Sequence, residues 1–330
     1  MRQKSLPCCF FPTTVMLVDD DSIFLKLMEN KLGNSFPMSS FSNPAAAAES
    51  LSKFPSENKM ITRCLSNPGN ADPEHELIDI NIREIHYELY NKQRFATVSV
   101  LLIDYDMPGM NGIEVSKHVQ DPRIKKVLLT GQADNDVAVQ AFNDGLIHKF
   151  VQKSVPDLAT KLRDIIQELQ FEYFMDLSRS IMQGLRENSD TLQSLRAPEF
   201  IKLHKELMQQ NDIVEYYLID ARGSFVMVNG SGQAFWLVLK SDSDMNRCYE
   251  YAKFDAAPKE ILESLQQKTK IPFFYTEQDL VAPPETWGRL LHPATLLPGD
   301  INYYYSMIAS GPIYRLEQDL LLPYQAYAEL

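Results

Sequence analysis

Between residues 14 and 155, short apolar runs alternate with segments whose apolar residues recur at helical spacing. We expect the apolar runs to form strands at residues 15–18, 36–41, 98–103, 127–129 and 150–152. Because these runs are apolar on both faces, they are typical of strands buried between two layers of helix. The alternation predicts an α/β domain with a parallel sheet and helices packed on both of its faces.

Helical segments are predicted between these strands at residues 21–33, 43–54, 115–120 and 137–146. The first begins at Asp21 or Ser22, whose side chains can cap a helix N-terminus. The second begins at Asn43-Pro44, and proline is favoured in the first turn of a helix. Together with the strands, they place the α/β domain at residues 14–156.

Residues 55–96 interrupt this alternation as an insertion. The first part, 55–73, is rich in Ser, Asn and Pro and is predicted to be a mobile loop. The second part predicts an extra amphipathic helix, because its apolar residues share one helical face: Ile78, Ile82, Ile85 and Leu89. So long an insertion is unusual in a compact domain. It therefore either faces a partner or packs back onto its own domain.

A helical pattern with a period close to 3.6 residues follows from residue 157 to about 187. At 1.5 Å per residue such a helix would reach about 45 Å, which exceeds the width of a small domain. We therefore expect it to project as a connector. A second predicted helix ends near Asn211, so residues 157–210 are interpreted as a helical linker.

Residues 211–330 predict an α+β domain with an antiparallel sheet and helices to one side. Strands are expected at 215–220, 224–229, 233–240, 273–275 and 301–308, and one helix at 243–269. The first hairpin faintly resembles the opening of PAS sensor domains, although the strand that follows at once departs from their order. The six histidines of the chain have no metal spacing, and this region shows no constellation for an output enzyme.

Polar residues follow four of the predicted α/β strands: Asp19-Asp20, Asp104, Thr130 and Lys153. In a doubly wound sheet, sites form beyond the carboxyl ends of the strands. Three carboxylates gathered there repel one another and titrate upward unless a cation lies among them. An oxygen-only ligand set is the preference of Mg²⁺. With a lysine and a threonine hydroxyl nearby, the set suits phosphoryl transfer onto a carboxylate.

These residues resemble the receiver domain of two-component response regulators. The motifs are Val-Asp-Asp-Asp at 18–21, Ile-Asp-Tyr-Asp-Met-Pro-Gly-Met-Asn-Gly at 103–112, Leu-Leu-Thr-Gly at 128–131, and Lys153. All four occur in the family's order, and the resemblance covers residues 14–155, a little under half of the chain. It implies a flavodoxin-like fold, with five parallel strands in a doubly wound sheet.

The resemblance implies that Asp104 is the phosphoryl acceptor, supplied by a histidine kinase or a phosphotransfer protein. Asp19 and Asp20 would hold Mg²⁺ together with Asp104 and the backbone carbonyl of Asp106. The chemistry of the chain itself would then be limited to accepting the phosphoryl group and releasing it again by autodephosphorylation.

The resemblance also implies a switch. Lys153 would pair with the phosphoryl group, and Thr130 would turn its hydroxyl inward once Asp104 is modified. Phe150 occupies the aromatic switch position and would rotate inward as Thr130 moves. An inert core phenylalanine is the alternative interpretation of Phe150. The switch would then act on the linker and the output domain through dimerisation.

Two features depart from the family pattern. Ser154 follows Lys153, where the family usually has a proline after a cis peptide bond. A cis bond before serine would cost about 3–4 kcal/mol, so we expect a differently shaped loop. The other departure is the insertion, which lengthens the chain between Asp20 and Asp104. Neither departure removes a chemical group from the predicted site.

The output activity stays open between two alternatives. A transcription factor would bind DNA as a phosphorylated dimer, although the net charge of −12 argues against a large nucleic-acid surface. A phosphorylation-controlled binding module would instead hold a protein or a small molecule. An enlarged receiver with an unclassified output domain is also similar to the response regulator of an α-hydroxyketone quorum-sensing circuit.

The sequence predicts a cytoplasmic protein with no membrane partner. Its four cysteines do not form a disulfide framework. The apolar N-terminal run at 6–18 contains two prolines and leads into Asp19-Asp20-Asp21 without a signal-peptide cleavage site.

Overall fold

The computed structural model describes residues 4–54, 58–66, 79–131, 135–182, 190–280, 282–311 and 313–329. The chain forms two compact units. The N-terminal unit comprises Phe10–Asn67 and Asn91–Ile181, and the C-terminal unit comprises Met1–Cys9, Pro68–Tyr90 and Met182–Leu330. These units differ from the boundaries expected from the sequence, because part of the insertion belongs to the C-terminal unit and the 157–210 segment is divided between the two.

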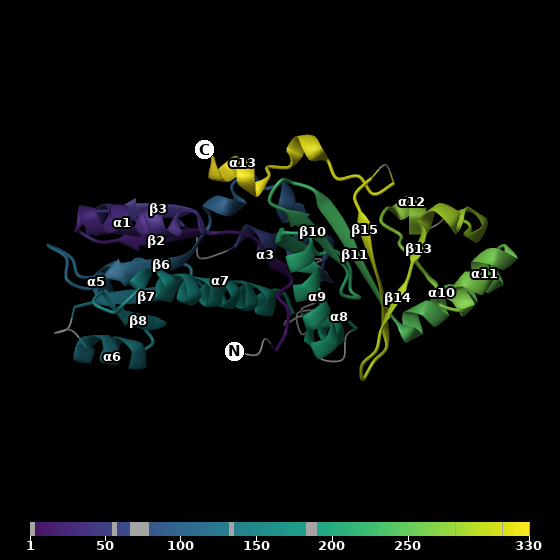
Figure 1. Ribbon diagram of the computed structural model, residues 1–330, viewed down its shortest axis with the longest axis horizontal. Helices are drawn as coiled ribbons and strands as arrows, with labels where there is room; N and C mark the ends of the chain where they lie inside the picture. The colour runs from purple at the N-terminus through teal and green to yellow at the C-terminus, as the bar shows by residue number, and fades with distance from the viewer. Residues whose placement is uncertain are drawn as a thin grey trace, which may run out of the picture. The chain divides into compact units, whose positions relative to one another are not determined.

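The N-terminal unit contains the predicted five-stranded parallel sheet, in the order β3-β2-β6-β7-β8 (Figure 1). Its strands are β2 (Thr14–Val18), β3 (Met38–Phe41), β6 (Val98–Asp104), β7 (Lys125–Thr130) and β8 (Lys149–Gln152). Its helices include α1 (Ser22–Leu32), α2 (Pro44–Ser52), α5 (Gly112–Ser116), α6 (Asn135–Asn143) and α7 (Leu158–Met182). This order confirms the flavodoxin-like receiver fold, and the strand order reverses at β2, beside β6.

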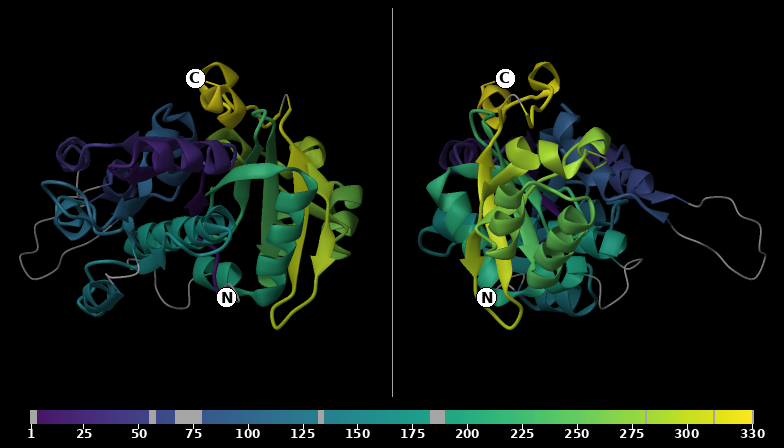
Figure 2. Two further views of the ribbon diagram at one scale, coloured as in Figure 1. Left: turned by 60° about the vertical axis from the view of Figure 1, so that its left-hand side comes forward. Right: turned by 90° about the vertical axis from the view of Figure 1, so that its right-hand side faces the viewer.

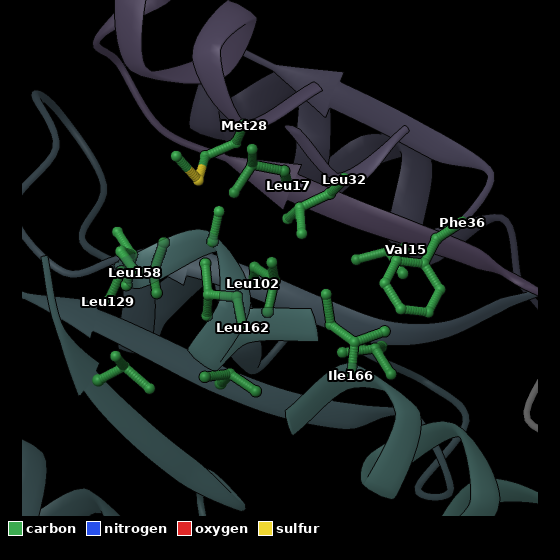
Figure 3. Close-up of a cluster of buried hydrophobic side chains, with 14 of the residues drawn as sticks. Val15, Leu17, Met28, Leu32, Phe36, Leu102, Leu129, Leu158, Leu162 and Ile166 are labelled. Atoms are coloured by element: carbon green, nitrogen blue, oxygen red, sulfur yellow. The ribbon is translucent and has the colours of Figure 1, made fainter. Parts of the chain in front are cut away.

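Apolar side chains pack on both faces of this sheet. On one face, Val15 and Leu17 of β2 pack with Leu32 of α1 and with Leu162 and Ile166 of α7 (Figure 3). On the other face, Leu128 of β7 packs with Ala138 and Ala141 of α6. Alternate residues of β7 therefore enter different cores, which explains why the strands read as continuous apolar runs.

Helix α7 begins at Leu158, close to the expected start, but its first half covers the sheet. Leu158, Leu162, Ile166 and Leu169 lie in the core of the N-terminal unit. The apolar residues predicted along this helix do share one face, and that face packs against the sheet of the N-terminal unit. The expectation of a connector that projects from the domain is therefore wrong for this half of the helix.

The C-terminal unit contains a six-stranded sheet in the order β1-β9-β10-β11-β15-β14, with β9, β10, β11, β15 and β14 paired antiparallel (Figure 2). The strands are β1 (Cys9–Phe10), β9 (Ile213–Leu218), β10 (Phe225–Asn229), β11 (Ala234–Ser241), β14 (Thr295–Leu297) and β15 (Tyr303–Ala309). A two-stranded sheet joins β12 (Lys270–Pro272) to β13 (Leu291–Pro293). The predicted antiparallel α+β architecture is confirmed.

The helices of this unit are α8 (Asp190–Arg196), α9 (Pro198–Gln210), α10 (Asp242–Phe254), α11 (Lys259–Gln266), α12 (Glu277–Leu280) and α13 (Tyr324–Ala328). The single helix expected at 243–269 is wrong, because α10 ends before Ala256, which has a φ of 53°. Pro258 lies directly before α11, and proline cannot continue a helix from the preceding residues. The strand expected at 273–275 is also wrong, and the neighbouring β12 ends at Pro272.

The insertion contains more structure than expected. Helix α3 (Lys59–Cys64) lies inside the predicted loop 55–73, where Asn58 caps its N-terminus. The rest of that loop, 55–57 and 67–73, and Ile78 lie outside the described residues. The predicted amphipathic helix is present as α4 (Arg83–Tyr87), followed by a 3-10 turn at Glu88–Tyr90.

Helix α4 belongs to the C-terminal unit, where it packs against β9. Ile85 and Leu89 are fully buried, as their spacing predicted. None of the described helices is both long enough and apolar enough to cross a lipid bilayer.

Candidate functional site

The carboxyl ends of the parallel strands carry the predicted site residues. Asp19 follows β2, Asp104 ends β6, Thr130 ends β7, and Lys153 follows β8. Because these four strands are neighbours in a parallel sheet, their carboxyl ends meet at one edge. The fold therefore gathers residues that lie far apart in the sequence.

Three carboxylates and one ammonium group are in contact at this edge. One carboxylate oxygen from each of Asp19, Asp20 and Asp104 lies within 4.8 Å of the other two. The Nζ atom of Lys153 lies 2.7 Å from Oδ2 of Asp19 and 2.9 Å from Oδ1 of Asp104. Lys153 thus bridges the two buried carboxylates, whereas Asp20 is exposed.

Burial has the largest single effect on the pKa values of the charged groups in this site. Burial raises the pKa of Asp19 above 3.8, and the ion pair with Lys153 opposes that rise only in part. The pKa of Asp104 is raised for the same reasons. For Lys153, burial lowers the pKa, but the hydrogen bonds to both carboxylates outweigh it and leave the pKa above its usual value. The pKa values of Asp19 and Asp104 are therefore raised, as the sequence predicted, but burial contributes more to the rise than repulsion among the clustered carboxyls does.

The ligand chemistry fits a hard divalent cation. All of the clustered side-chain donors are carboxylate oxygens, and Mg²⁺ is held in proteins by one or two carboxylates together with water. Asp106 lies two residues after Asp104 with its side chain exposed and outside the carboxylate cluster. Only its backbone carbonyl was predicted as a ligand.

Thr130 offers a free hydroxyl. Its side chain is fully buried, and its Oγ1 has no hydrogen-bond partner among the described residues. Its backbone carbonyl accepts a hydrogen bond of 2.9 Å from the amide of Lys153. A buried hydroxyl without a partner is costly, so this group is available to a new acceptor near the carboxylates.

Phe150 is half-buried on the opposite face of the sheet from α7. It packs against the cluster formed by Leu128, Ala138, Ala141 and Ile147. Phe150 of β8 therefore packs against side chains of both β7, which carries Thr130, and helix α6.

Sequence reasoning missed the local contacts that hold the acidic residues in place. The amide of Asp21 donates a 3.0 Å hydrogen bond to Oδ1 of Asp19, while the Asp21 side chain caps α1. The ring centroid of Phe24 lies 4.8 Å from Nζ of Lys153. The Asp21 cap was visible in the sequence, but its amide contact was not.

Gly112 allows helix α5 to approach the acceptor strand. A Cβ atom at this position would lie 2.3 Å from the carbonyl oxygen of Asp104 and 2.9 Å from Cδ1 of Leu128. Asn111 caps the helix in a reciprocal capping box with Glu114. The Asn-Gly pair of the motif thus has a steric role beside Asp104.

The loop after Lys153 contains no unusual peptide bond. Every peptide bond among the described residues is trans, including the bond between Lys153 and Ser154. The chain turns through Pro156 and Asp157, which has a φ of 50°. Lys153 reaches both carboxylates in this loop without a proline directly after it.

Known proteins share the receiver fold of this chain. The family described as "Response regulator receiver domain" matches residues 76–167. The structure is similar to that of the response regulator LqsR of Legionella pneumophila, with a TM-score of 0.82, 32% identity, and coverage of 99% of this chain and 96% of that one. The chain therefore belongs to the response regulator family.

Two curated relatives match part of this chain. The uncharacterized transcriptional regulatory protein YesN of Bacillus subtilis is 24% identical over 119 residues, which are 35% of this chain and 32% of that protein. The hydrogenase transcriptional regulatory protein HoxA of Cupriavidus necator is 35% identical over 63 residues, which are 18% of this chain and 13% of that protein. The chain thus spans a third or less of these relatives.

Proposed function

We propose that this response regulator accepts a phosphoryl group on Asp104 from a histidine kinase or a phosphotransfer protein. The contact that carries the proposal is Lys153, which lies within 2.9 Å of carboxylate oxygens from both Asp19 and Asp104. A phosphoryl oxygen on Asp104 would have the same ammonium group as its counterion.

In the transfer, a carboxylate oxygen of Asp104 forms a bond to phosphorus as the P–N bond of the donor phosphohistidine breaks. Lys153 favours the ionised form of Asp104, although burial keeps the pKa of this carboxyl above its usual value. Asp19, Asp20, Asp104 and the carbonyl of Asp106 would hold Mg²⁺, which neutralises charge on the transferring oxygens. Hydrolysis of the acyl phosphate would return Asp104 to its original state.

The response would start at the hydroxyl of Thr130, whose oxygen has no partner in this state among the described residues. Hydrogen bonding to the new phosphoryl oxygen would draw Thr130 inward, and Phe150 would move with it. Because Phe150 packs with Ala138 and Ala141, this movement would change how α6 lies on the sheet.

Helix α6 also supports the proposed homodimer. Its outer side chains Val137, Val139 and Phe142 are 39%, 44% and 48% exposed. Exposed apolar groups on an element that moves with the switch suit an interface formed on phosphorylation. We propose that this dimer, in the cytoplasm, transmits the signal to the C-terminal unit.

The test is modification of the full chain with a small phosphodonor. With acetyl phosphate and Mg²⁺, we expect the intact mass to rise by one phosphoryl group, and we expect Asp104→Asn to abolish the gain. Asp106→Asn is the matched control, because it changes an exposed carboxyl two residues away and keeps the backbone carbonyl. An equal mass gain in Asp104→Asn would contradict the proposal.

A further inference from the structure

A second candidate site lies in the C-terminal unit. A cavity of about 530 Å³ is lined by the segment of the insertion around α4, by the end of β9, by β11 and by residues 273–276. Its volume falls within the usual range for small-molecule sites. One wall of the cavity comes from the insertion, which is not part of the receiver motifs.

Lys240 is a buried cation that faces this cavity. Side chains of β11 alternate between the two faces of the sheet, and Val238 and Lys240 both line the cavity. Lys240 is 8% exposed, and no carboxylate pairs with it among the described residues. Burying an unpaired ammonium group is costly, so this position calls for an anion that the described chain does not supply.

Two other cations, the buried Lys125 and the 45% exposed Arg222, have carboxylate partners. Nζ of Lys125, which is 5% exposed, lies 2.5 Å from Oδ2 of Asp176. Nε of Arg222 lies 2.9 Å from Oδ1 of Asp244. Lys240 differs from both, because no carboxylate pairs with it among the described residues.

His86 is a second buried polar group in the lining. It is 4% exposed, and its Nδ1 has no hydrogen-bond partner among the described residues. Burial, together with the charge of Arg83, lowers its pKa to about 4. The ring is therefore neutral at pH 7. Its Nδ1 atom can donate a hydrogen bond to a ligand or accept one from it, depending on the tautomer.

The remaining charges of the lining are mostly positive. Arg83 and Arg222 line the cavity beside Lys240, with Asp220 as the one carboxylate of this lining. Oδ1 of Asp220 already accepts hydrogen bonds from the amides of Arg222 and Ser224. The chain as a whole has a net charge of −12, whereas the lining of this cavity carries more positive than negative side chains.

Aromatic rings form the other wall. Tyr87, Phe273, Phe274 and Tyr275 line the cavity. The ring of Trp236 lies behind them, with its centroid 4.5 Å from that of Tyr275. A flat ring can stack on such a wall, and Trp236 lies close enough to report it by fluorescence.

We propose that this cavity binds a small organic anion that carries a flat ring, with the ring against the aromatic wall and the anionic oxygens toward Lys240 and Arg83. The anion is a phosphate or a carboxylate, which these cations recognise alike. The proposal does not depend on phosphorylation of Asp104. It would make the C-terminal unit of this response regulator a ligand sensor.

The experiment uses full-length Asp104→Asn protein in EDTA, so that the receiver site can neither accept a phosphoryl group nor bind Mg²⁺. The probes are phenyl phosphate, benzoate, inorganic phosphate and phenol, and their binding is followed by tryptophan fluorescence and by calorimetry. We expect phenyl phosphate or benzoate to bind saturably, and each to bind more tightly than inorganic phosphate or phenol.

Lys240→Met should weaken that binding at least about tenfold, the effect of losing one charge-assisted hydrogen bond. Arg83→Ala should also weaken it and leaves the core intact, because Arg83 is exposed. Lys205→Met is the control, since Lys205 is exposed on α9 and does not line the cavity. No saturable binding of either ring-bearing anion, or unchanged affinity in both Arg83→Ala and a folded Lys240→Met, would overturn the proposal.

Discussion

Replacement of Lys153 by methionine tests the electrostatics of the acidic site. The side chain of Lys153 is 26% exposed, while those of Asp19 and Asp104 are 0% and 9% exposed. Lys153→Met therefore leaves two buried carboxylates without their shared counterion. Breaking a fully buried ion pair costs about 3–5 kcal/mol, and the partial exposure of Lys153 reduces this to about 2 kcal/mol at pH 7 without metal.

The sign of the pH dependence follows from the raised pKa values of Asp19 and Asp104. A carboxyl whose pKa is higher in the folded state binds more protons there than in the unfolded chain. Its contribution to stability is complete below the unfolded value of 3.8 and is lost as the pH rises through the folded pKa. Without Lys153 both values rise further, so the deficit should be largest at pH 7 and shrink toward pH 4.

The assay is urea unfolding followed by far-UV circular dichroism, at pH 7 and near pH 4.5, in EDTA and then in Mg²⁺. Mg²⁺ at one hundred times its dissociation constant should return about 2.7 kcal/mol. Lys149→Met is the matched control: Lys149 is 30% exposed, begins the strand β8 that Lys153 follows, and pairs with Glu168 away from the carboxylate cluster. Equal losses in the two variants, or a loss in Lys153→Met that does not change with pH, would refute the reasoning.

Two further substitutions test the packing and the switch. Gly112→Ala should destabilise the N-terminal unit by about 1–3 kcal/mol in urea unfolding, because the new Cβ would lie 2.3 Å from the carbonyl oxygen of Asp104. Gly288→Ala, where a Cβ meets nothing within 4 Å, should change stability by less than about 0.5 kcal/mol, and similar effects would contradict the steric argument. Thr130→Val removes a buried hydroxyl that has no partner among the described residues, so unfolding should be unchanged or up to about 1 kcal/mol more costly. In the wild type, a beryllofluoride mimic of the phosphoryl group should change the amide hydrogen exchange of α6. Thr130→Val should abolish this change, and a preserved change would argue against the proposed role of Thr130.

The site was predictable because each of its residues directly follows or ends an apolar run. A parallel sheet brings such positions to one edge whatever the length of chain between them. Asp19, Asp104 and Lys153 were therefore placed together correctly, even though the insertion separates Asp19 from Asp104. The orienting amide of Asp21 was not predictable, because backbone donors carry no sequence signal.

The C-terminal unit was harder to predict because tertiary packing decided its elements. The periodicity of Ile85 and Leu89 correctly predicted a buried helical face, but it could not indicate which sheet would cover that face. The spacing of apolar residues likewise predicted one continuous helix across Ala256, where the chain in fact turns. Lys240 does have a sequence signal, because it is the one charged residue in strand β11.

The chain passes between its two compact units four times, at Cys9/Phe10, Asn67/Pro68, Tyr90/Asn91 and Ile181/Met182. Neither unit is therefore one continuous segment that could be separated from the other by dividing the chain at a single position. A fragment ending at residue 156 would lose the α7 side chains of its own core and would carry α4 stripped of the sheet that shields Ile85. Truncation or exchange of one unit would therefore expose apolar core side chains and favour aggregation. Point substitutions in the intact chain avoid this problem.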